Sequence, residues 1–352
     1  MRKTAKTRPG RLILFVGVAH LVLTGSVISA LAQTPAVPPR MPYTAIDHPQ
    51  FVGVAEATFL IDDDIVIGVA RGDVAKAYAV ADLSQHGVAM DQMPDGPISV
   101  TFCITCNTAA VFRTAVKGQR LHFEYDSMVG ANEVDKDRET GSRWQQSTGE
   151  AISGSFKGSH LELYPFVRTT WKEWRRRFPN TVVLKPLPGY AENIPSRRAR
   201  INEGIPGGLS APKGAFGQDE RLRPKEIVAG LTIGQDTTAY PFSALRYAHV
   251  VNDKVGGLPV LVVHQPSSDT TTAFEARANS KSLRFQAVDG KASRLTDLET
   301  HSIWDAYGLC LQGPLKGTQL KTLVLVPEFW FAWSEFHPQT KVFMAASQQF
   351  SK

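Results

Sequence analysis

Short runs of β-branched and aromatic residues, separated by Gly, Asp and Pro, fill most of the chain. They include "DIVIGVARG", "AKAYAV", "PISVTFC", "AAVFRTAV" and "RLHFEYD". Runs of this length and composition are typical of strands joined by tight turns. The pattern therefore predicts a fold that is mainly β.

One segment has a helical pattern instead, "TTWKEWRRRFPNT" at residues 169–181. Thr169 or Thr170 could cap its N-terminus, and Pro179 follows its end. The basic run at residues 175–177 would complement the helix dipole in the last turn. We expect one short amphipathic helix here, with its tryptophans packed in the core.

The chain also resembles itself when it is shifted, first by 162 positions and later by 160 and 159. "AKAYAVADL" at 75–83 then meets "TTAYPFSAL" at 237–245, and "DRETGSRW" at 137–144 meets "DLETHSIW" at 297–304. Self-similarity at a fixed spacing is the signature of a repeat. The tryptophans match in order, Trp144 with Trp304, Trp171 with Trp330, and Trp174 with Trp333.

These patterns together predict an α+β fold, predominantly β, made of two tandem homologous halves. Each half would be closed by one Trp-containing amphipathic helix. The first repeat covers residues 43–190, and the second covers 222–352. Residues 191–221 between them are rich in Pro, Gly and charge, which is linker composition.

The first 32 residues have the pattern of a secretory signal peptide. Five basic residues precede an apolar stretch that begins at Leu12 and ends in Ala30-Leu31-Ala32. We expect cleavage after Ala32, an extended leader at 33–42, and a periplasmic or secreted protein. No later segment has the ~20 apolar residues that a membrane span needs, so we expect no stable span after cleavage.

The export signal also explains the basic charge of the chain. The whole chain has 39 Lys and Arg residues and 33 Asp and Glu residues. Five of the basic residues and none of the acidic ones lie in residues 1–32, which leaves 34 against 33. This balance argues against a nucleic-acid partner. We expect a small-molecule, metal or thiol-redox partner in the export compartment.

Two of the three cysteines, Cys103 and Cys106, form a CxxC pair in "VTFCITCNTAAVF". Exported proteins meet oxidising conditions, in which such a pair can close a disulfide. Cys310 is left over. It meets Ala151 of the first half, so we expect it to be a buried free thiol.

The second half lacks this pair, because Gln265 and Ser268 stand at the matching positions. Features of both halves are expected to serve folding, whereas reactive features of one half are candidates for function. We therefore place the site in the first half and interpret the second half as a degenerate copy that supports it.

Several other polar residues of the first half are missing from the second. They are, with their counterparts in parentheses, His86 (Ala248), His122 (Arg284), Asn132 (Ala292), Arg138 (Leu298) and Glu150 (Leu309). Three other polar residues of the first half recur in the second, and we interpret them as a structural turn with local side-chain to backbone hydrogen bonds. They are Asp137, Glu139 and Thr140, matched by Asp297, Glu299 and Thr300.

Four segments together resemble the bacterial domain family of unknown function DUF3179. They are "IVIGVARGDVAKAYAV", "PISVTFCITCNTAAVF", "DRETGSRWQQSTGEAISG" and "TTWKEWRRRFPNTVVL". The resemblance covers essentially the whole first half and, more weakly, the second.

The resemblance implies a tryptophan-histidine-glutamate segment ending in asparagine-aspartate, then a strand, then cysteine-proline-x-cysteine. His86 and Asp91 match the histidine and the final aspartate, and both cysteines are present. The residues that depart from the family pattern are Gln85, Gly87, Met90 and Ile104.

The first hypothesis for the CxxC pair is a metal site. Asn107 follows Cys106 where c-type haem attachment needs a histidine, and no second cysteine pair is present for a four-cysteine zinc site. Two thiolates and one imidazole suit copper, especially Cu(I), or zinc. Cys103 and Cys106 would supply sulfur, and His86 is the preferred nitrogen. The accessory candidates are His122, Asp91, Asn132, Arg138 and Glu150.

Two alternatives need no metal or other cofactor. A thiol–disulfide centre would use the lowered pKa of a CxxC thiol. It would need a scaffold unlike thioredoxin, because "NTAAVF" resumes a β pattern where thioredoxin has a helix. A static disulfide would close a tight turn, although a loop this short gains little from cross-linking.

The sequence does not decide whether the protein is an enzyme. It has no GxSxG elbow and no HExxH motif, which argues against a conventional hydrolase. A non-catalytic binding module with a structural disulfide, and a small-molecule ligand between the halves, both stay open.

Overall fold

The computed structural model describes residues 43–202, 219–288, 290 and 292–345, all of which belong to one compact unit. The predicted signal peptide (1–32), the leader up to residue 42 and residues 203–218 of the predicted linker lie outside the described residues. Within the described ranges, no helix is both long enough and apolar enough to cross a bilayer.

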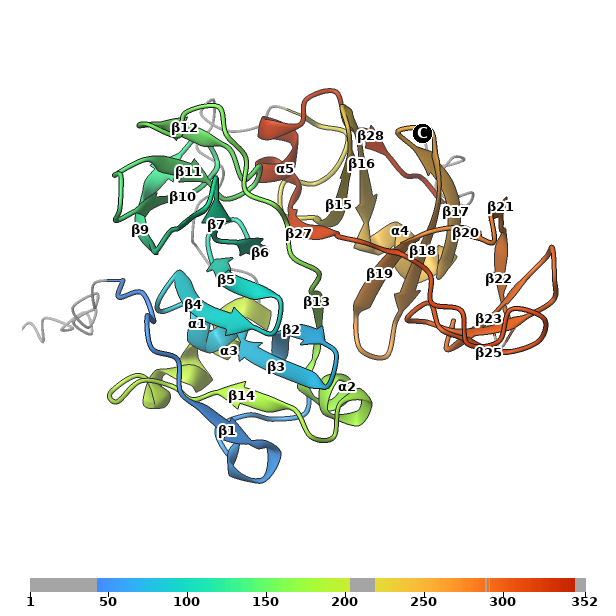
Figure 1. Cartoon of the computed structure of the whole chain (residues 1–352), viewed down its shortest axis with the longest axis horizontal. Coiled ribbons are helices and arrows are strands. Elements are labelled where there is room, and N and C mark those ends of the chain that lie inside the picture. The colour runs from blue at the N-terminus through green and yellow to red at the C-terminus, as the bar shows by residue number, and fades with distance from the viewer. Residues whose placement is uncertain (1–42, 203–218, 289, 291, 346–352) are drawn as a thin grey trace, which may run out of the picture. The chain divides into compact units, whose positions relative to one another are not determined.

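The described residues are mostly β, as the sequence predicts (Figure 1). We refer to residues 43–190 as the first half and to 222–345 as the second half. The strands of the first half are β1 (Phe51–Gly53), β2 (Ile65–Arg71), β3 (Val74–Ala79), β4 (Val88–Met93), β5 (Gly96–Cys103), β6 (Thr108–Arg113), β7 (Ala115–Val116), β8 (Gln119–Arg120), β9 (Phe123–Val129), β10 (Asn132–Asp137), β11 (Arg143–Gln145), β12 (Ala151–Ser153), β13 (Val167–Thr170) and β14 (Val182–Leu184).

The second half is likewise made mainly of short strands. They are β15 (Ile227–Ile233), β16 (Asp236–Pro241), β17 (Val250–Val255), β18 (Leu258–Gln265), β19 (Thr270–Glu275), β20 (Arg277–Ala278), β21 (Lys281–Ser282), β22 (Phe285–Ala287), β23 (Arg294–Asp297), β24 (Ile303–Asp305), β25 (Cys310–Gln312), β26 (Thr322–Leu323), β27 (Val326–Phe329) and β28 (Lys341–Val342).

The helices are short. They are η1 (Val54–Glu56), α1 (Val80–Leu83), α2 (Trp171–Arg177), η2 (Ala191–Asn193), α3 (Ile194–Asn202), α4 (Phe242–Ala248) and α5 (Trp330–Phe336). Helix α2 begins after Thr170, whose hydroxyl accepts a hydrogen bond from the Glu173 backbone N–H at 3.3 Å. Helices η2 and α3 lie in the predicted linker. They are ordered there because Ile194 is buried and Ile201 packs on the first half's core.

The sheets of the two halves pair in corresponding ways. In the first half β2 lies between β3 and β13, and β14 adds to β3 in parallel. In the second half β15 lies between β16 and β27, and β28 adds to β16 in parallel. The registers also correspond, because Val66 faces Ala79 in one hairpin and Val228 faces Pro241 in the other.

Two strands cross from their own half onto the other half. Strand β13 belongs to the first half's sheet and packs on β19, and β27 belongs to the second half's sheet and packs on β6. Strands β6 and β19 each follow a hairpin turn, after β5 and β18 respectively (Figure 1). The β5–β6 turn carries the CxxC pair, so the crossing of β27 brings residues of the second half to it.

Candidate functional site

Cys103 and Cys106 form a disulfide across the β5–β6 turn, with their Cα atoms 5.7 Å apart. Cys103 ends β5 and pairs with Thr108, the first residue of β6. Asn107 closes the turn with φ of 53°, a left-handed conformation that asparagine tolerates better than most residues. The local sequence thus favours a tight turn that places the two sulfurs together.

The disulfide is buried at the junction of the two halves. Cys103 is 2% exposed and Cys106 is fully buried. The backbone N–H of Phe329 in β27 donates to the Cys106 carbonyl at 2.8 Å. Ala131, Phe331 and Ala332 complete the apolar cluster around the pair. The second half therefore forms part of the wall of this site.

Asn132, an accessory candidate from the sequence, contacts the disulfide directly. Its amide nitrogen Nδ2 lies 3.3 Å from the Cys106 sulfur and 2.8 Å from the Thr108 hydroxyl. Its oxygen Oδ1 accepts hydrogen bonds from Gln145 Nε2 at 3.1 Å and from the Ser147 backbone N–H at 3.0 Å. Because two donors hold the oxygen, the amide N–H groups point toward the sulfur.

A carboxyl group from the second half completes the polar site. Glu328 in β27 is fully buried, and its Oε1 accepts from Asn132 at 2.6 Å and from Thr108 at 2.8 Å. Its Oε2 accepts from the Ser147 hydroxyl at 2.8 Å. Burial raises the pKa of the Glu328 carboxyl to about 7, although these three hydrogen bonds act in the opposite direction. The group is therefore able to gain or lose a proton near neutral pH.

Sequence reasoning missed Glu328, because it placed the whole site in the first half. The signal was present, since Glu328 is the one charged residue within "LVLVPEFWFAW". In the 159-residue register it meets Thr169, so the carboxyl is specific to one half. A charge in an apolar run is expected to have buried partners.

His86 has contacts of its own. Its Nδ1 lies 2.9 Å from the Thr44 carbonyl, and its ring packs on Tyr190 with centroids 4.5 Å apart. Its Nε2 lies 3.7 Å from Asp82 Oδ1, and both groups are fully buried. None of these contacts joins His86 to Cys103, Cys106 or the accessory candidates.

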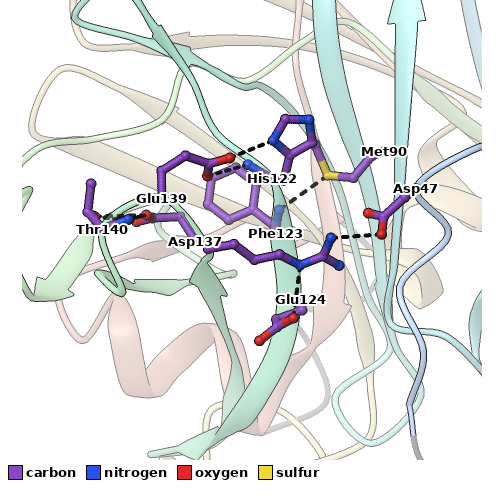
Figure 2. A network of polar contacts seen from close by, with 9 residues as sticks. Asp47, Met90, His122, Phe123, Glu124, Asp137, Glu139 and Thr140 are labelled. Carbon is purple, nitrogen blue, oxygen red and sulfur yellow. Dashed lines mark hydrogen bonds and ion pairs between the residues drawn. The ribbon is translucent and has the colours of Figure 1, made fainter.

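His122 and Arg138 lie in a different network, which Figure 2 shows from close by. His122 Nδ1 is 2.6 Å from Glu139 Oε1. Arg138 pairs with Asp47 at 2.7 Å and with Glu124 at 2.9 Å. All of these side chains are partly exposed. The network joins strand ends at the surface and does not reach the disulfide through any of these contacts.

The remaining accessory candidates also have other partners. Asp91 accepts from Lys76 at 2.7 Å and from the Tyr78 hydroxyl. Glu150 is partly exposed and lies 3.9 Å from His160. Of the five accessory candidates, Asn132 is thus the one with a hydrogen bond to the cysteine pair.

The recurring turn is confirmed as a structural feature. Asp137 Oδ1 accepts from the Thr140 backbone N–H at 2.6 Å (Figure 2). Asp137 Oδ2 accepts from Trp144 Nε1 at 2.8 Å. Asp297 does the same for Thr300 and Trp304, at 2.5 and 2.9 Å. Each aspartate therefore ties a tight turn to a core tryptophan.

Two further buried carboxyls, Glu133 and Asp135, lie on β10 beside Asn132. Burial raises the pKa of Asp135 to about 7 and raises that of Glu133 well above its ordinary value, with the nearby Asp135 charge as a second cause. One oxygen of each group has no hydrogen-bond partner. The first half therefore contains two more carboxyls with raised pKa values. The sequence pattern did not identify them.

The metal hypothesis has little support from the donor atoms. Across the described ranges, no three His, Cys, Asp or Glu side chains gather in a group that could hold a metal ion. The two sulfurs are bonded to each other, which leaves them poor metal donors until they are reduced. Cys310 is confirmed as a buried free thiol, and burial raises its pKa.

Comparison with known proteins agrees with the resemblance seen in the sequence. A family described as "Protein of unknown function (DUF3179)" matches residues 41–340, which is most of the chain. No curated protein matches the chain. No solved structure matches it either.

Proposed function

Because the chain belongs to the DUF3179 family, whose description gives no activity, we propose its function from its own geometry: a thiol–disulfide redox protein on a scaffold unlike thioredoxin. The centre is the Cys103–Cys106 disulfide. The single observation that carries the proposal is the hydrogen-bonded connection from Cys106 through Asn132 to the buried carboxyl of Glu328.

The reaction is a dithiol–disulfide exchange with an external dithiol as reductant. A thiolate of the reductant attacks Cys103, forms a mixed disulfide and releases Cys106 as a thiolate. The second thiol of the reductant, as a thiolate, then attacks the mixed disulfide, so that the reductant becomes a disulfide and Cys103 leaves as a thiolate. The chain gains two electrons and two protons in total.

The site favours Cys106 as the leaving group. Cys103 is slightly exposed whereas Cys106 is fully buried, so attack on Cys103 requires the smaller displacement. The Asn132 amide donates to the Cys106 sulfur, and a donor to a thiolate stabilises the charged form. Glu328 holds a proton near neutral pH within the same network. While the carboxyl holds this proton it is neutral, so it does not oppose the negative charge of the Cys106 thiolate.

The corresponding turn of the second half has no disulfide, which is evidence against a purely structural role for the Cys103–Cys106 disulfide. We propose that this half is a degenerate copy of the first, because most of its strands correspond in order and pairing, and the β15–β16 hairpin has the register of β2–β3. Its β18–β19 turn has the same length, and Asp269 has φ of 51° at the position of Asn107. Ser268 replaces Cys106 there. The fold therefore makes this turn without a cross-link.

The test is the reduction potential of residues 33–352, measured in dithiothreitol buffers by mass spectrometry after thiol trapping. We expect a midpoint between about −120 and −270 mV, the range of redox-active protein pairs. A midpoint below about −300 mV would identify a structural disulfide and overturn the proposal. Cys310 provides an internal reference, because it is a free thiol in either state.

Metal binding by the reduced pair is the alternative, and the same samples test it. Reduced protein is mixed with Cu(I) or Zn²⁺, and the mass of the complex is measured by native mass spectrometry. If the wild-type protein binds an ion and both the Cys106→Ser and the His86→Ala variants fail to bind it, the result would favour a metal centre over redox exchange. An ion lost in Cys106→Ser alone would show that the dithiol binds metal without His86.

A further inference from the structure

A cavity of about 250 Å³ lies on the other crossing, where β13 packs on β19. Residues of both halves line it, and no Asp or Glu is among them. Its charged residues are Arg168 and Arg177. Its aromatic lining residues are Phe166, Trp174, Phe178, Phe242, Phe274 and Tyr307.

The two arginines are neutralised to different extents. Arg177 stacks on Tyr307, 3.6 Å from the ring centroid, and its Nη1 lies 3.3 Å from Asp305. Arg168 is only 9% exposed, and Asp269, at 3.5 Å, is its one carboxylate partner in the described part of the chain. Asp269 has a closer partner in Arg246, at 2.8 Å.

Arg168 is therefore a buried cation with a weak and shared counter-ion. Its Nε has no hydrogen-bond partner among the described residues. A buried charge that lacks full pairing is costly, unless another anion approaches it. The adjoining cavity supplies the space for such an anion, and its aromatic walls would cover an apolar body.

We propose that this cavity binds a small aromatic carboxylate, with the carboxylate toward Arg168 and the ring among the aromatic residues. An arginine binds a carboxylate through charge-assisted hydrogen bonds of favourable geometry. The cavity is near the lower end of the size range of small-molecule sites, which restricts the ligand to one or two rings. The site is separate from the disulfide and does not depend on the redox proposal.

The test is isothermal titration calorimetry of residues 33–352 with 2-naphthoate, and with 2-naphthalenemethanol as the neutral analogue. We expect one saturable site for 2-naphthoate and binding at least about tenfold weaker for the alcohol. Arg168→Met should weaken 2-naphthoate binding by about tenfold or more. Arg246→Gln is the matched control, because it removes the other arginine of Asp269 but does not line the cavity.

Three results would overturn the proposal: no saturable binding of 2-naphthoate at millimolar concentration, equal binding of the alcohol, or unchanged binding by Arg168→Met. If Arg168→Met does not fold, Thr322→Phe replaces it. Thr322 is exposed and lines the cavity, so a phenyl group there should fill the cavity and abolish binding while the fold is kept. Wild-type binding by folded Thr322→Phe would place the ligand elsewhere and refute the site.

Discussion

Two strand crossings join the halves of this protein, and they share a backbone arrangement but differ in chemistry. Where β27 crosses β6, the Glu328 carboxyl meets the Thr108 hydroxyl at 2.8 Å. Where β13 crosses β19, Thr169 meets Thr270 at 2.6 Å. Ser268, which stands at the position of Cys106, bonds to Thr270 at 2.7 Å. One crossing thus has a disulfide and a buried acid, and the other has hydroxyl groups and the Arg168–Asp269 ion pair.

The two crossings show which features the fold needs to join its halves and which features only one crossing has. The β13–β19 crossing joins the halves without a disulfide or a fully buried acid, so neither group is needed for that purpose at the other crossing. Burying a carboxyl is unfavourable compared with burying a neutral group. A buried acid kept beside a disulfide is therefore better explained by chemistry than by stability. The predictions below test this comparison.

The largest effect should come from a feature that the two halves share. Trp174 and Trp333 are buried, and each donates to a threonine hydroxyl, at 2.8 and 3.1 Å. Each indole also packs against a glycine, Gly68 or Gly230, where a Cβ would come within 2.3 or 2.1 Å. Changing either tryptophan to Ala should lower the free energy of unfolding by about 3–5 kcal/mol.

Urea denaturation of both variants measures this effect. Similar losses are expected, because the two environments correspond. If one variant lost less than about 1 kcal/mol while the other lost several, the two halves would not be equivalent in the fold.

The next largest effect should be on how the free energy of unfolding depends on pH. The pKa of Glu328 is about 7 in the folded chain and about 4.3 when the chain is unfolded. At a pH between about 4.3 and 7, the Glu328 carboxyl is ionised in the unfolded chain but keeps its proton in the folded chain. The free energy of unfolding therefore falls as pH rises from about 4 to 7, by roughly 3 kcal/mol from this group. In Glu328→Gln this part of the pH dependence should disappear.

The measurement is urea denaturation of wild type and Glu328→Gln at several pH values from 4 to 8. Glu133 and Asp135 have raised pKa values too and remain in both proteins, so only the difference between the two curves reports on Glu328. Thr169→Val is the matched control, because it loses a hydroxyl contact at the other crossing without a titrating group. A difference that does not change with pH would contradict a raised pKa for Glu328.

A smaller effect on stability is expected from the disulfide. The double variant Cys103→Ser, Cys106→Ser should lose no more than about 2 kcal/mol, because the closed loop is short. Ser268 already occupies the second position in the other half. The same variant should lose all exchange with dithiothreitol. A loss of stability well above this value would instead favour the structural role.

The sequence predicted the local features of the site well. The CxxC pair and the turn around Asp137 follow from short-range pattern. The buried state of Cys310 follows from its match to Ala151 in the first half. Asn132 was identified because the second half has Ala292 in its place. Such features depend on a few neighbouring residues, which the sequence displays directly.

Features that depend on long-range packing were not predicted. Glu328 reaches the disulfide because β27 crosses onto β6, 220 residues away from Thr108 in sequence. No local pattern encodes that crossing. Helix α3 was not predicted either, because its buried Ile194 and partly buried Ile201 lie among basic residues whose composition resembles a linker.

The smallest effect should come from Asn132, and it tests the redox proposal most directly. Asn132→Ala introduces the residue that the second half has at this position, Ala292, which is fully buried there. The change removes the N–H donor to Cys106, so the Cys106 thiolate is less stabilised and the reduction potential should fall by about 30 mV. Arg138→Leu, which also introduces the second half's residue, should leave the potential unchanged because Arg138 pairs with Glu124 and Asp47. Equal shifts in both variants would mean that the amide contact does not tune the disulfide.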